Sequence, residues 1–197
     1  MDVAEAVNRR KSVRAFLPDA VDNDVLSELL VTASRSPSGG NVQPWRIYVV
    51  NGDAMTRFRT FIAERPPGAP AYDIYPPSLH EPYRSSRYKL GEQMYESIGV
   101  GRDDKAGRFT QFAKNLDFFG APAALFCFID RAMGPPQWSD LGMFLQTFML
   151  LAQEAGIDTC SQEAWAVHEP AVMEFGGVPD ELRLFCGMAI GRADWDH

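Results

Sequence analysis

Three side chains near the N-terminus are typical of an anion-binding site. The segment RRKSVRAF carries Arg10, Ser12 and Arg14 at alternating positions, with Lys11 between the first two. Alternate residues of an extended segment point the same way, so two guanidiniums and one hydroxyl are expected to face one ligand. Arg binds phosphate oxygens bidentately, which makes a phosphate beside a polyol a suitable ligand. A solvated helix end, where cations complement the helix dipole, explains the same cluster without a ligand.

A second group of polar residues lies in SPSGGNVQPW, between an expected helix and an expected strand. Gly39 and Gly40 have no side chain, so the backbone can approach a flat ligand closely and donate its N–H groups. Asn41 and Gln43 add side-chain donors and acceptors. A helix end followed by a turn accounts for the same residues.

Two later motifs each add one charged residue to the candidates. Glu163 belongs to GIDTCSQEAW, and Arg192 ends the apolar run GMAIGR. Glu163 is either part of a site or an exposed loop carboxylate, which is the usual position of a Glu. Arg192 is either a surface charge or a further phosphate ligand.

The composition excludes several classes of function. The 197 residues carry a net charge of −7 with a pI near 5.0, which argues against a general nucleic-acid binder. The N-terminus has no apolar signal-peptide core, and no apolar run is long enough to predict a membrane span. Two of the three cysteines lie in strongly apolar runs, so we expect buried free thiols and a cytoplasmic location. The three histidines lack metal-ligand spacing.

The hydrophobic pattern predicts one α+β domain over residues 1–197. The expected helices cover residues 2–10, 22–33, 53–64, 86–98, 105–118, 138–155 and 168–175, and the expected strands 45–50, 123–129 and 183–190. Residues 65–81 are rich in proline and predict a long loop. The helix 138–155, with Ser139 as its expected cap, is apolar nearly all round and should lie at the centre or in a subunit interface.

Taken together, RRKSVRAF, PSGGNVQPW, GIDTCSQEAW and MAIGR resemble, in this order and over most of the chain, the FMN-dependent nitroreductase family. Within it, YPPSLHEPYRSSRYKLGE, FFGAP and CSQEAWAVH are most similar to the branch of nitrobenzoate and nitroaromatic reductases. The resemblance implies a nitroreductase-like fold, with a central, mostly antiparallel sheet flanked by helices in an interlocked homodimer. It also implies FMN as the cofactor, NAD(P)H as the reductant and a nitroaromatic acceptor.

The same resemblance assigns residues to FMN in three groups. Residues of the first motif and a C-terminal cation are assigned to the phosphate and ribityl chain of FMN, namely Arg10, Lys11, Ser12 and Arg192. Arg14 matches a cation near flavin N1 and O2, where it favours the reduced anion. Glu163 and Ala164 match a Glu-Gly pair whose backbone faces flavin N5, and Ala suits this position if its φ is negative.

The remaining assignments concern the partner subunit and the acceptor. The loop that reaches FMN from the partner is matched by Pro37, Ser38, Gly39, Asn41 and Gln43, although Gln43 can instead tie the loop to the next strand. Tyr83 and Arg84 are expected to contact substrate as an aromatic wall and a cation, or else to lie in an interface. Trp165 or Phe119 either walls the flavin face or belongs to the core.

Two other functions remain open from the sequence. One is a dehalogenase or flavin-transforming enzyme on the same fold, and the other is a non-catalytic FMN-binding protein. Family members usually continue in a tail that embraces the partner. The end of this sequence at His197 therefore predicts either a shortened sequence or reduced contacts between subunits.

Overall fold

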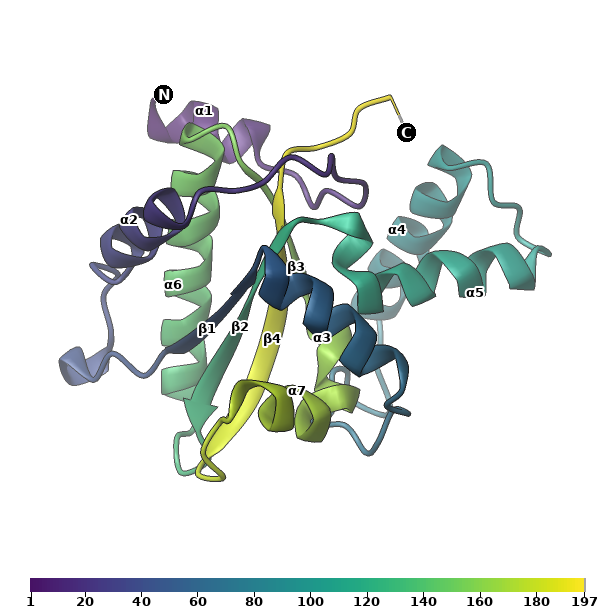
Figure 1. Cartoon of the computed structure of the whole chain (residues 1–197). Helices are drawn as coiled ribbons and strands as arrows, with labels where there is room; N and C mark the ends of the chain where they lie inside the picture. Colours follow the sequence, from purple (N-terminus) through teal and green to yellow (C-terminus); the bar gives the residue numbers. More distant parts are fainter. Residues whose placement is uncertain (197) are drawn as a thin grey trace.

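A computed structural model of the chain describes residues 1–196, and its helices surround a four-stranded sheet (Figure 1). The strands are β1 (Arg46–Asn51), β2 (Ala123–Asp130), β3 (Asp158–Gln162) and β4 (Leu182–Gly191). The α-helices are α1 (Val3–Arg9), α2 (Asn23–Ala33), α3 (Asp53–Ala63), α4 (Tyr83–Ser97), α5 (Lys105–Ala113), α6 (Pro135–Glu154) and α7 (Glu169–Gly176). Three short 3-10 helices are η1 (Gly39–Asn41), η2 (Lys114–Gly120) and η3 (Glu163–His168).

The sheet has the order β1-β2-β4-β3, and all three pairings are antiparallel. Helices α2 and α6 cover one face, and α3 and α7 cover the other (Figure 1). Strand β2 shows why the chain needs both layers: Phe126 and Phe128 pack on one side, whereas Leu125 and Cys127 pack on the other. An uninterrupted apolar run is expected of a strand buried on both faces. The predicted α+β class with a mostly antiparallel sheet is confirmed.

The predicted elements differ from the structure in several places. Strand β3 was not predicted, because the sequence DTCSQ is polar and lies at the sheet edge, where β4 is the only strand that pairs with it. Helix α6 begins at Pro135 rather than near Ser139, whose hydroxyl donates back to Pro136 O and therefore caps nothing. Proline suits the first turn of a helix, where its missing N–H is not needed. Helix α5 ends at Ala113 and continues as η2, and α4 starts at Tyr83.

Helices α4 and α5 form an arm that projects away from α2 and α6 (Figure 1). None of the residues of α4 is buried, and Gln111 is the only buried residue of α5. The Pro-rich segment 65–82 leads into the arm without regular structure, as predicted, and it is tied to η3. Gly68 N donates to Val167 O and Ala71 N to Ala166 O, both at 2.8 Å. Across residues 1–196, none of the helices has the length and apolar character that a membrane span needs.

Candidate functional site

The basic segment after α1 runs beside the edge strand β3. Ser12 forms a parallel bridge with Thr159, and Val13 N donates to Thr159 O at 3.1 Å. Val13 is buried, whereas its neighbours Ser12 and Arg14 are exposed. The predicted extended conformation is therefore present. It anchors the segment through Val13 and leaves the polar side chains on the surface of the sheet edge.

A cavity of about 640 Å³ opens beside this segment, and we call it cavity A. Its walls come from the basic segment, from α4 and α5, and from the chain after β4. They include Lys11, Ser12, Arg14, Met94, Ser97, Gln111, Lys114, Ala193, Asp194 and Trp195. Lys11 lies over the Trp195 ring, with Nζ 5.4 Å from its centre.

A second cavity of about 430 Å³, cavity B, shares Arg14, Met94 and Gln111 with cavity A. Its inner wall consists of the residues at the end of β3 and the start of η3, namely Ser161, Gln162, Glu163 and Ala164. Its outer wall comes from segment 65–82 and the arm, with Ile74, Tyr75, Arg87, Tyr95 and Phe112. The predicted residues Arg14, Glu163 and Ala164 thus meet in one place. The φ of Ala164 is not positive, which satisfies the condition for replacing Gly there.

Two features of residues in or next to the walls favour an anionic, hydrogen-bonding ligand. Arg10 and Arg14 form no ion pair within residues 1–196, and Arg14 Nη1 donates only to Ser12 O, at 3.2 Å. Gln162 is buried, and its Nε2 donates to Asn115 O at 2.8 Å. Its Oε1 has no partner in the described chain, so it can accept a donor from a ligand. FMN supplies both a phosphate and ring N–H groups and therefore fits these walls.

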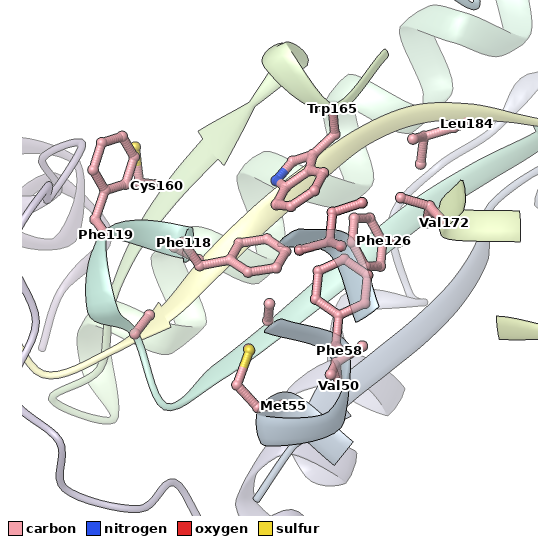
Figure 2. Packing of buried hydrophobic residues seen from close by; sticks show 14 of the residues in the cluster. Val50, Met55, Phe58, Phe118, Phe119, Phe126, Cys160, Trp165, Val172 and Leu184 are labelled. Carbon is pink, nitrogen blue, oxygen red and sulfur yellow. The ribbon is translucent and has the colours of Figure 1, made fainter. Parts of the chain in front are cut away.

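The inner wall rests on a cluster of buried aromatic rings. Trp165 is fully buried and lies among Phe58, Phe118 and Phe126, with ring centres 4.7–5.4 Å from its own (Figure 2). Trp165 is therefore a core residue, as the alternative reading had it. Phe119, by contrast, lines cavity B. Phe118 and Phe119 both have positive φ, which bulky residues rarely adopt, so the core holds this turn against local strain.

Burial and charge act together on the titratable groups of the site. Burial raises the pKa of the Glu163 carboxyl above its usual value. Burial also raises the pKa of the Cys160 thiol, while the nearby charges of Arg14 and Arg10 act in the opposite direction. The charges of Arg10 and Arg14 thus act on Cys160, the central residue of β3. The three cysteines are free and buried, as the apolar runs predicted for two of them.

Two predicted ligands lie next to the cavities without lining them. Arg10 caps the C-terminus of α1 and is half-buried. Arg192 is exposed, and its carbonyl accepts from Leu17 N at 2.9 Å. The cavity walls include Lys11 on one side and Ala193 on the other, so both cations are one residue away from them.

The predicted loop residues lie at the other edge of the sheet. Pro37, Ser38, Gly39, Asn41 and Gln43 precede the edge strand β1, and none of them lines cavity A or B. The segment between α2 and β1 lies on the opposite side of the molecule from the arm (Figure 1).

Hydrogen bonds fix the conformation of this loop. Gly39 N donates to the buried Asp140 on α6, and Gln43 N donates to Ser38 Oγ at 2.9 Å. Gln43 Nε2 donates to Asn41 Oδ1 at 2.9 Å. Gly40 has φ +58, so a backbone requirement accounts for this glycine without a ligand.

Tyr83 and Arg84 line neither cavity. The guanidinium of Arg84 pairs with Glu81 at 2.8 Å, and the Tyr83 ring packs on His80. The same part of the chain instead contributes Tyr75 and Arg87 to cavity B.

The sequence analysis also missed wall residues at the end of α5 and the start of η2. Gln111 and Lys114 are three positions apart, a spacing that places polar side chains on one helical face. Gln162 was quoted within CSQEAW but was given no role. Its position directly before Glu163 was the available signal.

Comparison with known proteins places this architecture in one family. The family model "Nitroreductase family" matches residues 7–192. A 4-nitrobenzoate reductase of Pseudomonas putida is 36% identical over 195 residues, covering 98% of this chain and 86% of that protein. A nitrobenzene nitroreductase of Ectopseudomonas oleovorans is 32% identical over 197 residues, covering 98% and 87%. The chain belongs to the nitroreductase family.

Solved structures agree with this placement. The FMN and NADPH-dependent nitroreductase NfnB from Sphigopyxis sp. strain HMH superposes with a TM-score of 0.95 at 45% identity, covering 100% of this chain and 90% of that one. The FMN-dependent nitroreductase NfnB from Mycobacterium smegmatis, solved in complex with NADPH, superposes with a TM-score of 0.88 at 27% identity. The match covers 98% of this chain and 90% of that one.

Proposed function

We propose that this protein is an FMN-dependent oxidoreductase that uses NAD(P)H to reduce nitroaromatic compounds. The observation that carries the proposal is the meeting of Arg14, Glu163 and Ala164 on the walls of cavity B, which adjoins the cationic cavity A. These residues come from motifs about 150 positions apart in the sequence. Membership of the nitroreductase family supports the same function.

In this proposal the chain's own residues hold and tune the flavin. Arg10, Lys11, Ser12 and Arg192 bind the phosphate and ribityl chain, because cations without carboxylate partners form charge-assisted hydrogen bonds to phosphate oxygens. Arg14 places a positive charge at the junction of the two cavities. Gln162 Oε1 accepts a hydrogen bond, and the backbone of Glu163 and Ala164 shapes the reactive edge. FMN, when bound, supplies the redox chemistry between nicotinamide and nitro group.

The separation of the predicted ligands supports a homodimer. Residues 37–43 lie at the β1 edge, whereas Ser12 lies beside β3 at the opposite edge. One copy cannot bring both groups to one flavin without unfolding, but a second copy can supply the loop. We further infer a single FMN-binding domain and a cytoplasmic location, which the three free cysteines favour.

The experiment that tests the function starts with the visible spectrum of the purified, FMN-loaded protein. Anaerobic NADPH or NADH is expected to bleach the band near 450 nm, and 4-nitrobenzoate or nitrobenzene is expected to restore it. A band that does not bleach indicates a non-catalytic flavin-binding protein. Bleaching without consumption of either nitro compound indicates another reaction on the same fold. A protein that cannot be loaded with FMN contradicts the proposal altogether.

Arg9 provides a matched control for the phosphate assignment. Arg10→Ala is expected to raise the dissociation constant of FMN by about tenfold or more, because hydrogen bonds to charged groups contribute about 1.5–3 kcal/mol. Arg9→Ala should leave FMN binding unchanged, since Arg9 is already paired with Glu5 at 3.4 Å. Fluorescence quenching of FMN on titration with protein measures both. Equal FMN affinities in the two variants would remove Arg10 from the phosphate site.

A further inference from the structure

The outer wall of cavity B carries an arginine without a carboxylate partner. Arg87 lies on α4, and its guanidinium carbon is 4.2 Å from the centre of the Tyr75 ring. Both residues line the cavity that contains Glu163 and Ala164. Arg87 forms no ion pair in the part of the chain that the structure describes. Contact with the ring orients the guanidinium and leaves its N–H groups able to bind an anion.

Two other arginines of the arm are already paired with carboxylates. Arg84, one turn earlier on the same helix, is paired with Glu81 at 2.8 Å. Arg108 on α5 is paired with Glu92 at 2.7 Å. Arg87 therefore differs from these two arginines in having no carboxylate partner and in lining cavity B. Such a cation beside a cavity is suited to a bidentate carboxylate.

The rest of the lining suits a flat apolar group. Ile74, Met94, Phe112 and Phe119 contribute apolar surface, and their side chains can cover an aromatic ring on more than one side. Glu163 is the only carboxylate on the cavity walls among the described residues. It belongs to the inner wall, and burial disfavours its charged form. The cavity thus combines apolar walls with two cations that have no carboxylate partner, Arg14 at the junction with cavity A and Arg87 on the outer wall. These features complement an aromatic carboxylate.

We propose that Arg87, held over Tyr75, binds the carboxylate of an aromatic acid acceptor, so that cavity B selects anionic nitroaromatic compounds over neutral ones. The inference rests on the proposed nitroreductase function and names the substrate class of that site. It assigns to Tyr75 and Arg87 the roles that the sequence predicted for Tyr83 and Arg84. Arg84 and Arg87 lie on one helix, but only Arg87 lines cavity B, so Arg84 is a matched control for the assignment.

The experiment compares kcat/KM for 4-nitrobenzoate and nitrobenzene on the FMN-loaded protein at saturating NADPH. Arg87→Gln is expected to lower the ratio of the two values by about tenfold, which is the usual size of a lost charge-assisted hydrogen bond. Nitrobenzene serves as the internal control, because it has no carboxylate and its own kcat/KM should stay within about twofold. Arg87→Lys should restore part of the ratio, since it keeps the charge but not the bidentate geometry. Arg84→Gln should leave the ratio unchanged.

A second readout does not depend on turnover. Benzoate, which cannot be reduced in this reaction, is titrated into the FMN-loaded wild type and into Arg87→Gln by isothermal calorimetry. The dissociation constant is expected to rise by about tenfold in the variant. An unchanged benzoate affinity overturns the proposal.

The kinetic outcomes separate the inference from the proposed function. In one outcome, wild type reduces both acceptors while Arg87→Gln leaves both kcat/KM values unchanged or lowers them by the same factor. In that case only the inference is wrong. A change confined to KM for NADPH means that Arg87 binds the nucleotide phosphates instead, which also overturns it. If wild type reduces neither nitro compound, the proposed function fails and the inference fails with it.

Discussion

The two walls of cavity B differ sharply in how the chain supports them. The inner wall follows β3 and rests on Trp165, which is fully buried among aromatic rings (Figure 2). The outer wall belongs to an arm in which α4 has no buried residue at all. Phe109 and Leu90 on this arm are 73% and 63% exposed. One wall is therefore part of the core, and the other is a surface element.

This difference separates two requirements of a redox site. A cofactor needs a wall whose geometry does not change, and packing around Trp165 provides it. An acceptor needs a wall whose side chains can differ without loss of the fold, and an exposed helix tolerates such changes. Arg87 lies on that second wall. The comparison predicts that stability depends on the inner wall and acceptor choice on the outer one.

The largest expected effect is on the inner wall. Trp165→Ala should lower the free energy of unfolding by about 3–5 kcal/mol, because it removes a fully buried ring and leaves a cavity. Phe109→Ala on the arm should change it by no more than about 0.5 kcal/mol. Urea denaturation of both variants measures the difference. Similar losses in the two variants would show that the walls are not supported differently.

A glycine in each region gives a second, smaller test. A Cβ on Gly187 of β4 would lie 2.4 Å from Trp165 Cδ1, so Gly187→Ala should cost about 1–3 kcal/mol through overpacking. Gly91 of α4 has nothing within 4 Å of an added Cβ. Gly91→Ala should therefore stabilise the helix by about 0.5–1 kcal/mol. The midpoint of thermal unfolding should fall in Gly187→Ala and rise in Gly91→Ala. Midpoints that shift in the same direction would contradict the comparison.

The smallest expected effect concerns the pair that joins the two helices of the arm. The hydrogen bond from Arg108 lowers the pKa of Glu92 below its usual value of 4.5. Because the folded-state pKa is the lower one, the pair stabilises the arm above the unfolded pKa and is lost as pH falls through the folded pKa. Arg108→Gln should let the pKa of Glu92 rise towards 4.5, as followed by NMR of its carboxyl carbon. A pKa that stays low would mean that another group holds it.

Much of the fold was predictable because its pattern is local. The buried strands β2 and β4 and helices such as α2 and α3 show apolar spacing that burial on one or both faces requires. Strand β3 was not predictable in the same way, since its polar residues pair only with β4 and Ser12. The start of α6 was misplaced because Ser139 is a common cap type, whereas the Pro residues in the first turn decided the boundary.

The motifs of the candidate site were predictable from the sequence, but the cavity that their residues share was not. Arg14, Glu163 and Ala164 were chosen by resemblance, and the structure brings them to one cavity. Gln111 and Met94 were missed because neither belongs to a motif, and only the tertiary placement of the arm puts them on both cavities. Tyr83 and Arg84 were chosen on residue type alone, which cannot tell one turn of an exposed helix from the next.

The sequence by itself determined the family, the fold class and the types of side chain available to a flavin, because these depend on local order and spacing. Tertiary structure decided which of them share a cavity. It left Arg87 on the outer wall of cavity B with no carboxylate partner, paired Arg84 with Glu81, and placed the loop 37–43 at the other edge of the sheet. The physical reason is that contacts between residues far apart in the chain depend on how helices and strands pack, and no local pattern records that packing.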